Sequence, residues 1–433
     1  MQWRMCGKDI HQVAQGMSIV FVTVTVQIQA SAQANEPQCD EVLSPLRQMH
    51  RSVEDSGIAP FAAFTSEAWA NVHGGIDRGA WYNHLLDFGL ELDTGKLGWW
   101  QNGTFVIQFH WVEHAGEGSC FEESAGSFNP VSNISAKDHF RVYNLHYAHE
   151  WRDGLISLKL GQIATDDDFM GSDYSAMFLN SAFGAMPSQV GTPLAASCGN
   201  SSAFPIYSVA APGLFFRWNP NDRFYSQVGI YHGRIGPDAE DNYGFSWAES
   251  PLELGLFWES GMNHKLLQRS GTLRLGLSYH TGPRDDFSGN ESVSETSQQA
   301  PDLYVIHDWS ILETAEGNPK LGWFWRAGFA PEHDCNIVDF YADTGLNWFA
   351  PIPTRDADAA GIAISYTRFG DDFRNSATGI AADETTVELT YQAQINRWFV
   401  LQADTQFLFN PTANSGSSRE TAIVLGLRGI TSF

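Results

Sequence analysis

A long segment between residues 163 and 210 carries the densest group of side chains able to hydrogen-bond a solute. It contains the carboxylates Asp166 and Asp168 and, further along, the amide Asn180 among small residues. Carboxylates and amides bond neighbouring hydroxyl groups, which is how proteins bind sugars. We therefore predict that these three residues line a constriction and contact a sugar. The alternatives are a solvated loop or a cation site, although the spacing is not that of a helix–loop–helix calcium loop.

Further candidate residues are spread along the chain and alternate with apolar residues in a two-residue repeat. This repeat puts them on one face of a strand, which becomes the lumen if the strands close into a barrel. The predicted pore-lining residues are Asp87, Glu91, Gln108, His110, His146, Lys159, Arg217, Arg274, Arg326, Asp404 and Arg428. Their alternative role is ordinary pore-wall electrostatics, in which opposed acids and bases order water and bind nothing.

No motif for catalysis or metal binding is found in the sequence. G-x-S-x-G and H-E-x-x-H are both absent, so neither a serine hydrolase elbow nor a zinc protease is indicated. His110 and His146 could bind a metal only if their strands lay together. We predict a protein that is not an enzyme and that has no metal and no cofactor.

The strands that would position these side chains are visible as alternation. Leu86, Phe88 and Leu90 alternate with Asp87 and Glu91, and similar repeats recur along the chain. The final segment, 421–433, alternates in the same way and ends on an aromatic residue. A spanning strand needs only about 9–11 residues, whereas a spanning helix needs about 20 apolar ones, which no segment after the first 34 residues supplies. Core strands of a soluble sandwich are the alternative for any one segment.

The connections between these strands favour the barrel. They alternate between short turns, such as 152–154 and 396–397, and long segments, such as 113–138 and 163–210. Short turns at one end and long loops at the other are typical of outer-membrane barrels. We predict an all-β fold, a transmembrane antiparallel up-and-down barrel of about sixteen strands over residues 58–433. Its short turns would be periplasmic and its long loops extracellular.

The composition agrees with an exported membrane barrel. The net charge is −25, yet only 17% of residues are charged and 13% are aromatic. This suits an apolar outside with polar loops, and the acidity argues against a nucleic-acid partner.

The N-terminus predicts the compartment. Residues 1–34 combine Arg4 and Lys8, an apolar run and a small-residue cleavage pattern, and are predicted to be a cleaved signal peptide. Residues 35–57 are predicted to form a short periplasmic helical segment. An exported protein can hold disulfides, and we predict one between Cys120 and Cys198, which lie in adjacent long loops.

Several stretches together resemble the carbohydrate-selective porins of the OprB type, over roughly residues 55–433. They are Leu85–Asp93, Leu160–Gln162 with the acidic run after it, Phe178–Gly184, Glu388–Gln394, Gln402–Gln406 and Asn410–Pro411. Ala403, where proline is expected, and the small residues Gly429 and Thr431 depart from the pattern. The resemblance implies a sixteen-stranded barrel, a homotrimer, and passive passage of monosaccharides.

We therefore predict a porin in the outer membrane of a Gram-negative bacterium, surrounded by lipid and lipopolysaccharide, that passes neutral monosaccharides such as glucose. The alternative is a general or cation-preferring diffusion porin without sugar selectivity. The basic candidates at lumen parity would face the acidic 163–210 segment. Opposed rows of charge suit neutral polyhydroxylated solutes, which bond to both signs.

Overall fold

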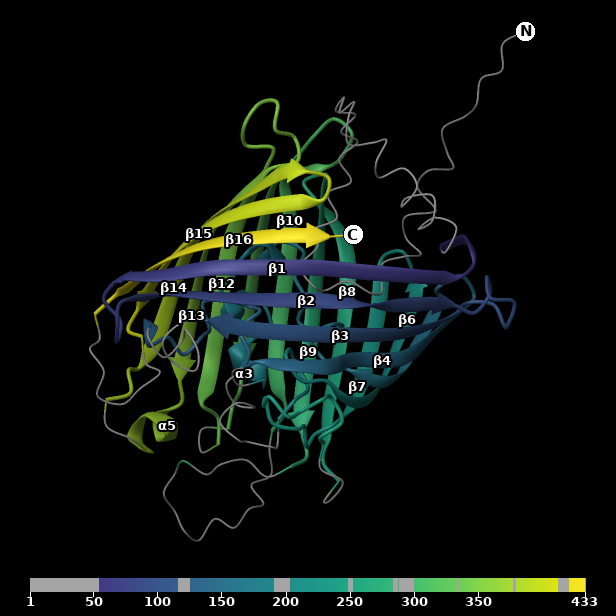
Figure 1. Ribbon diagram of the computed structural model, residues 1–433, viewed down its shortest axis with the longest axis horizontal. Helices are drawn as coiled ribbons and strands as arrows, with labels where there is room; N and C mark the ends of the chain where they lie inside the picture. The colour runs from purple at the N-terminus through teal and green to yellow at the C-terminus, as the bar shows by residue number, and fades with distance from the viewer. Residues whose placement is uncertain are drawn as a thin grey trace.

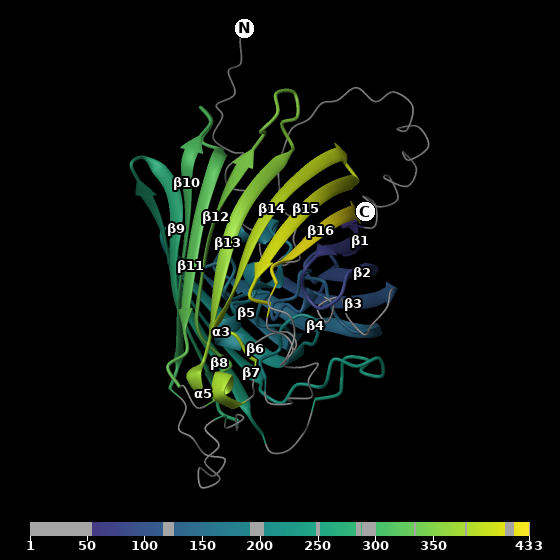
Figure 2. The same ribbon diagram turned by 90° about the vertical axis from the view of Figure 1, so that its left-hand side faces the viewer.

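Sixteen antiparallel strands close into a barrel in the computed structural model, which describes residues 54–115, 125–190, 203–247, 252–282, 287, 300–332, 335–376, 379–411 and 420–432 (Figures 1 and 2). Each strand pairs with its neighbours in the sequence, and the last strand pairs with the first. This confirms the predicted up-and-down barrel.

The strands are β1 (Ile58–His73), β2 (Gly79–Asp93), β3 (Gly103–Ala115), β4 (His139–Trp151), β5 (Ile156–Ile163), β6 (Ala211–Asn221), β7 (Phe224–His232), β8 (Leu254–Leu266), β9 (Arg269–His280), β10 (Asp302–Glu313), β11 (Pro319–Phe329), β12 (Val338–Phe349), β13 (Ala359–Phe369), β14 (Asp383–Asn396), β15 (Phe399–Phe409) and β16 (Ala422–Ser432). The helical elements of the described chain are the 3₁₀ turns η1 (Ser175–Met177) and η2 (Ser181–Phe183) and the short helices α3 (Pro187–Val190) and α5 (Asp371–Ser376). Within the described ranges, no helix is long and apolar enough to cross a membrane.

The connections alternate in length around the barrel. Residues 222–223, 267–268 and 397–398 form tight turns at one end, which we call the short-turn end. At the opposite, long-loop end the connections include 116–138 and 164–210. This matches the predicted alternation of short turns and long loops.

The two faces of the wall differ as the alternation predicts. On β16, Leu425 and Leu427 are exposed on the outside, while Val424 and Arg428 are buried. Exposed tryptophans, including Trp99 and Trp218, lie near the short-turn end, where a membrane interface favours amphipathic rings. The outer face is therefore the apolar, lipid-facing surface of a membrane barrel.

The final strand closes the barrel as its alternation suggests. β16 pairs with β1 from Ala63 opposite Ser432 to His73 opposite Ile423, and Glu67 lies directly across from Arg428. These two side chains form a buried ion pair inside the barrel. A charge-assisted contact between the two closing strands adds specificity to the register that the backbone ladder forms.

Strand β4 departs from strict alternation. Strict alternation puts Tyr143 outside with Leu145, but Tyr143 is buried and its ring stacks on His110 with the centroids 4.0 Å apart. A bulge on β4 causes the difference, because Gln108 pairs with Asn144 while Phe109 pairs with Val142, which leaves Tyr143 as an extra residue. The bulge reverses parity upstream of it, so Arg141 also faces inward.

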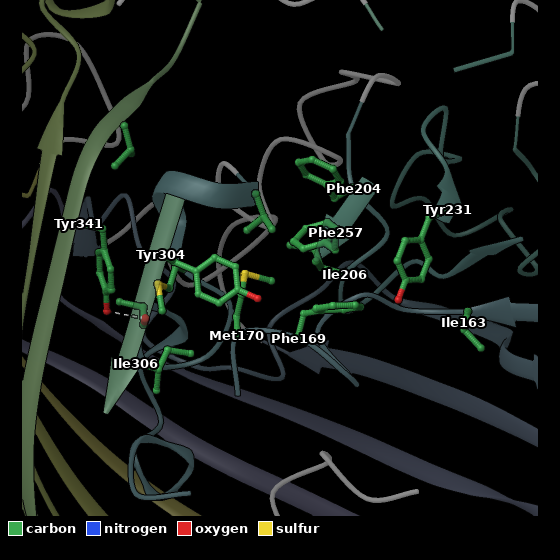
Figure 3. Close-up of a cluster of buried hydrophobic side chains, with 14 of the residues drawn as sticks. Ile163, Phe169, Met170, Phe204, Ile206, Tyr231, Phe257, Tyr304, Ile306 and Tyr341 are labelled. Carbon is green, nitrogen blue, oxygen red and sulfur yellow. Dashed lines mark hydrogen bonds between the residues drawn. The ribbon is translucent and has the colours of Figure 1, made fainter. Parts of the chain in front are cut away.

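The barrel interior is packed, and the connection between β5 and β6 fills much of it. We call its described residues, 164–190 and 203–210, the inward loop. Figure 3 shows Phe169, Met170 and Phe204 of this loop against Phe257 and Tyr304 of the wall. The Phe169 and Phe257 ring centroids are 5.2 Å apart, and those of Phe204 and Phe257 are 4.7 Å apart. Burying each such ring contributes about 1.5–3 kcal/mol, so apolar packing holds this loop against the wall.

Three predictions fall largely or wholly outside the described residues. The signal peptide, 1–34, is one of them, as is nearly all of the helical segment 35–57, since the description begins at Glu54. Cys120 and Cys198 also lie outside it, so the predicted disulfide stays a prediction.

Candidate functional site

The inward loop narrows the barrel. Its helix α3 lies within the barrel in both views of the ribbon (Figures 1 and 2). The loop is bonded by inward-facing side chains of the strands, and many of these contacts fall on three sectors of the wall. Outside them, Gln227 of β7 donates to the Asp168 carbonyl and Glu259 of β8 accepts from the Met170 amide. Predicted site residues lie in these sectors and in a further strip of the wall that is more accessible.

The first sector, on β11 and β12, is centred on Arg326. Its guanidinium donates to the carbonyl of Gly184 at 2.6 Å, to that of Ala182 at 2.9 Å and to that of Met170 at 3.3 Å. The same group makes a bidentate contact with Asp343, from Nε to Oδ1 at 3.2 Å and from Nη2 to Oδ2 at 2.5 Å. Its side chain has no exposed surface. Arg326 therefore fastens the inward loop to the wall.

The second sector, on β14 to β16, receives the middle of the loop. The Glu388 carboxylate accepts the amides of Leu179 at 2.6 Å and Asn180 at 2.9 Å. The Asn180 side chain donates to Gln406 at 2.9 Å, and Gln406 in turn donates to Asp404 at 3.0 Å. Asn180 is fully buried, and its side chain caps η2 and joins the loop to the wall.

Next to this sector, the connection between β3 and β4 is held in the same manner. Its described residues, 125–138, include Phe128 and Asn129, whose amides donate to the Glu384 carboxylate at 2.8 and 3.0 Å. Arg428 donates to Asn133 at 2.6 Å as well as pairing with Glu67. Arg428 therefore connects this second loop to the barrel closure.

The third sector, on β2 to β5, brings seven of the predicted residues together around three consecutive carboxylates of the inward loop, Asp166, Asp167 and Asp168, which we call the acidic triplet. The seven are Asp87, Gln108, His110, His146, Lys159, Asp166 and Asp168. Gln108 donates to Asp87 at 2.8 Å and accepts from Asn144 at 2.8 Å. Asn144 also donates to Asp167 at 3.0 Å, and Lys159 pairs with Asp168 at 2.6 Å.

The histidines of this sector are buried in the wall. His110 is fully buried, with its Nε2 atom 3.7 Å from Asp87, and His146 is also buried. No group of three or more potential metal ligands occurs in the part of the chain that the structure describes.

The acidic triplet has perturbed proton affinities because of its position. Burial and the neighbouring Asp166 and Asp168 carboxylates raise the pKa of Asp167 to about 8. Burial likewise raises the pKa of Asp166 to about 6. Adjacent carboxylates that share a confined site cannot all ionise at low cost. At neutral pH the triplet therefore carries less negative charge than its composition suggests.

A more accessible strip of polar groups runs across β6 to β9 and faces the start of η1. The Arg217 guanidinium lies 3.9 Å from the centre of the Tyr225 ring, and the Tyr225 hydroxyl donates to Glu259 at 2.7 Å. Gly261 lies between Tyr225 and Arg274 in the ladder. A side chain at Gly261 would overlap the Tyr225 ring, so this glycine lets the ring extend toward Arg274.

Across from this wall, the inward loop presents a carboxylate and an aromatic ring. Asp173 lies 3.5 Å from Arg274 and its side chain is 71% exposed, while Tyr174 beside it is half-buried. Arg274 also pairs with Asp308, and its side chain remains 12% exposed. We call Asp173, Tyr174, Arg217, Tyr225 and Arg274 the accessible strip. It offers charged donors and acceptors and a partly open ring, which are the groups that bond and stack on a sugar.

The predicted site residues thus separate by exposure. Those that are buried are Asp87, Gln108, His110, His146, Lys159, Asn180, Arg326, Asp404 and Arg428. Those with partial exposure are Glu91, Asp166, Asp168, Arg217 and Arg274. Sugar contact stays a prediction for each of them. Tyr225 was missed, although its parity with Gln227 beside a short turn signals an inward position.

Comparison with known proteins shows which family and which solved structures this chain is similar to. The family model described as "Carbohydrate-selective porin, OprB family" matches residues 77–433. Porin B of Pseudomonas aeruginosa is 24% identical over 417 residues, covering 86% of each chain. The high-pH structure of Pseudomonas putida OprB superposes with a TM-score of 0.75 at 20% identity, covering 90% of this chain and 97% of that one. The low-pH structure of the same protein gives a TM-score of 0.56 at 16% identity, with coverage of 93% and 100%.

Proposed function

This chain belongs to the OprB family of carbohydrate-selective porins, and we propose that it passes neutral monosaccharides such as glucose by binding them weakly at the accessible strip. It is a carbohydrate-selective porin of the Gram-negative outer membrane, and its family implies a channel rather than an enzyme. The proposal adds which solutes pass and which residues they touch.

The observation that carries the proposal is the placement of opposite charges across the narrowed lumen. Arg274 and Arg217 come from the wall, and Asp173 comes from the loop. A neutral sugar hydrogen-bonds to both signs and carries no charge for either to repel. A cation pore would favour acid throughout, and a phosphate pore would favour base at the constriction.

A second function, a general or cation-preferring pore without sugar selectivity, is favoured by the acid surplus. The net charge is −25 and Asp173 is the most exposed of the charges in the accessible strip. Under this alternative, ions would sense the field of the lumen, and sugars would pass without saturation.

Conductance in a planar bilayer distinguishes the two functions. Glucose should reduce the ion current of the wild type in a saturable way. Arg217→Gln should raise the half-blocking glucose concentration by about tenfold, since a hydrogen bond to a charged group is worth about 1.5–3 kcal/mol. This variant leaves no carboxylate unpaired, because the hydrogen-bond partners of Arg217 are the amide side chains of Asn219 and Gln227.

Lys320→Gln is the matched control. Lys320 has inward parity on β11, but it is exposed at the short-turn end. Its removal should shift ion selectivity and leave glucose block unchanged. If both variants shift ion selectivity alone, or if glucose never blocks the wild type, the general-pore function replaces the sugar site.

Three further features extend the proposal. We propose that residues 1–34 direct export and are cleaved, and that the short-turn end faces the periplasm. We also propose a homotrimer embedded among lipid and lipopolysaccharide. Cysteine labelling of whole cells tests the orientation, because Asn221→Cys in a short turn should resist an impermeant reagent whereas Tyr243→Cys in a long loop should react.

A further inference from the structure

A hollow opens on the outer face of the barrel, away from the lumen and near the short-turn end. Its volume is about 350 Å³. The outward-facing residues that line it are Trp218 and Pro220 of β6, Phe224 and Ser226 of β7, Ser260 and Met262 of β8, and Leu273 and Leu275 of β9. Because the outer wall faces lipid, a hollow here is open to hydrocarbon.

The hollow results from small residues placed between large ones. Trp218, Ser226, Ser260 and Leu275 lie side by side at one level of the ladder. The two serines form the floor, and the exposed side chains of Trp218 and Leu275 rise on either side of it. The floor is two strands wide, about 10 Å, which is the width of a hydrocarbon chain with space around it.

The polar atoms in the floor are bonded within the wall. The Ser260 hydroxyl donates to that of Ser226 at 2.8 Å, and the Trp258 indole donates to the same Ser226 oxygen at 3.1 Å. A hydroxyl in an apolar setting is costly when it lacks a partner. Since these two have partners, the floor can be covered by hydrocarbon at little cost.

The guanidinium of Arg223 lies at the end of the hollow nearest the membrane surface. Arg223 is in the turn between β6 and β7, and its Nη2 atom is 3.8 Å from the sulfur of Met262. Its guanidinium lies 5.2 Å from the centre of the Phe224 ring. Both neighbours line the hollow. Arg223 is three residues from Ser226, or about 10 Å along the strand.

We propose that this hollow binds one anionic glycerophospholipid, with an acyl chain over Ser226 and Ser260 and the phosphate beside Arg223. The apolar side chains that line the hollow suit an acyl chain, and the Arg223 guanidinium suits an anionic headgroup. A hydrocarbon or a neutral lipid would leave this guanidinium unused. The carboxylate of the adjacent Asp222 opposes the phosphate and limits the affinity. If the short-turn end faces the periplasm, the ligand comes from the inner leaflet.

Native mass spectrometry of the intact porin tests the site. The protein would be released from detergent containing phosphatidylglycerol or phosphatidylethanolamine. The wild type should retain one phosphatidylglycerol. Arg223→Gln should lower that retention about fivefold, the effect of about one basic residue at a membrane surface. Asp222→Asn should raise it, and Ser260→Leu, which fills the floor, should lower it at least about tenfold for both lipids, because each displaced methylene costs about fourfold.

Two control variants match these changes elsewhere on the barrel. Arg397→Gln removes an arginine that lies in the turn between β14 and β15 and stacks on the Trp398 ring. Ala403→Leu enlarges an exposed residue on the outer face of β15. Neither residue lines the hollow, so neither change should alter retention.

Two results would overturn the proposal. Retention that is unaffected by both Arg223→Gln and Ser260→Leu would show that the hollow binds no lipid. If Ser260→Leu instead dissociates an oligomer while lipid retention is unchanged, the hollow is a contact between copies of this chain. Glucose block is measured separately, so failure of the lipid site leaves the proposed sugar site untouched.

Discussion

Arg326 and Arg274 lie on the same wall, point inward and pair with carboxylates, yet they do different things. Arg326 is enclosed and bonds three carbonyls of the inward loop. Arg274 keeps part of its surface and faces the exposed Asp173. The difference comes from how the inward loop lies at each arginine: it turns three carbonyls onto Arg326, whereas beside Arg274 it presents the exposed Asp173. A charge at lumen parity is a structural anchor under the loop and stays accessible beside it.

Among the variants that test this difference, Arg326→Ala is expected to have the largest effect. It leaves the buried Asp343 carboxylate without its cation and the Met170 and Gly184 carbonyls without this donor, while the Ala182 carbonyl keeps only the Tyr341 hydroxyl. We expect the free energy of unfolding to fall by about 3–5 kcal/mol and the single-channel conductance to rise as the loop loosens. Urea unfolding in lipid vesicles measures the first effect and planar bilayers the second.

Arg368→Ala is the matched control for the anchor. Arg368 pairs with Asp339 at 2.7 Å, but its side chain is 44% exposed. An exposed pair contributes about 0–1 kcal/mol, so stability should change little and conductance not at all. Equal losses in the two variants would mean that the loop does not depend on Arg326.

A smaller effect is expected from Glu388→Ala, which compares the two loops inside the barrel. Glu388 accepts two amides of the inward loop, whereas Glu384 accepts two amides of the β3–β4 connection. Each alanine variant should cost about 1–3 kcal/mol, the penalty for buried amides left without acceptors. Only Glu388→Ala should weaken glucose block.

Glu388→Gln provides the rescue, because its amide oxygen still accepts a hydrogen bond. It should recover part of both losses. If Glu384→Ala weakens glucose block as strongly as Glu388→Ala, the constriction depends on both loops, and the inward loop does not set it alone.

The smallest effect concerns pH and the acidic triplet. The pKa of Asp167 is raised to about 8 by burial and by the neighbouring Asp166 and Asp168 carboxylates. Asp167 is therefore neutral below about pH 8 and ionises above it, so preference for cations should increase as pH rises through 8. Reversal potentials in a salt gradient measure this preference. Asp167→Asn should remove the step, and a step that persists in this variant would assign it to another group.

The raised pKa of Asp167 also makes the stability of the folded protein depend on pH. Between about pH 4 and pH 8 the folded chain holds a proton on Asp167 that the unfolded chain releases. Stability therefore falls as pH rises through this window. Asp167→Asn should flatten the dependence, which urea unfolding at pH 5 and pH 8 would measure. Lys159, Asn144, Asp166 and Asp168 face this group, so the apparent values belong to the cluster.

Alternation in the sequence correctly predicted which side chains of the wall face inward where the strand pairing is regular. It failed where the pairing is irregular. It correctly assigned Leu425 and Leu427 outside and Arg428 inside. It misplaced Tyr143, because a bulge adds a residue without leaving a mark in the pattern. For the same reason Arg141, a buried ion-pair partner of Asp238 at 3.0 Å, was not recognised as inward-facing.

The sequence by itself determined the barrel, its alternating connections and, where the ladder is regular, the side of the wall on which a charge lies. These follow from local rules, since a strand has a period of two and a turn is recognised within a few residues. The tertiary structure alone decided which of those charges a solute can reach. Asn180 and Arg326 appeared equivalent to Arg217 and Arg274 in the sequence, but the first two are covered. Their burial depends on contacts between the inward loop and strands more than a hundred residues away, and such long-range packing has no local signature.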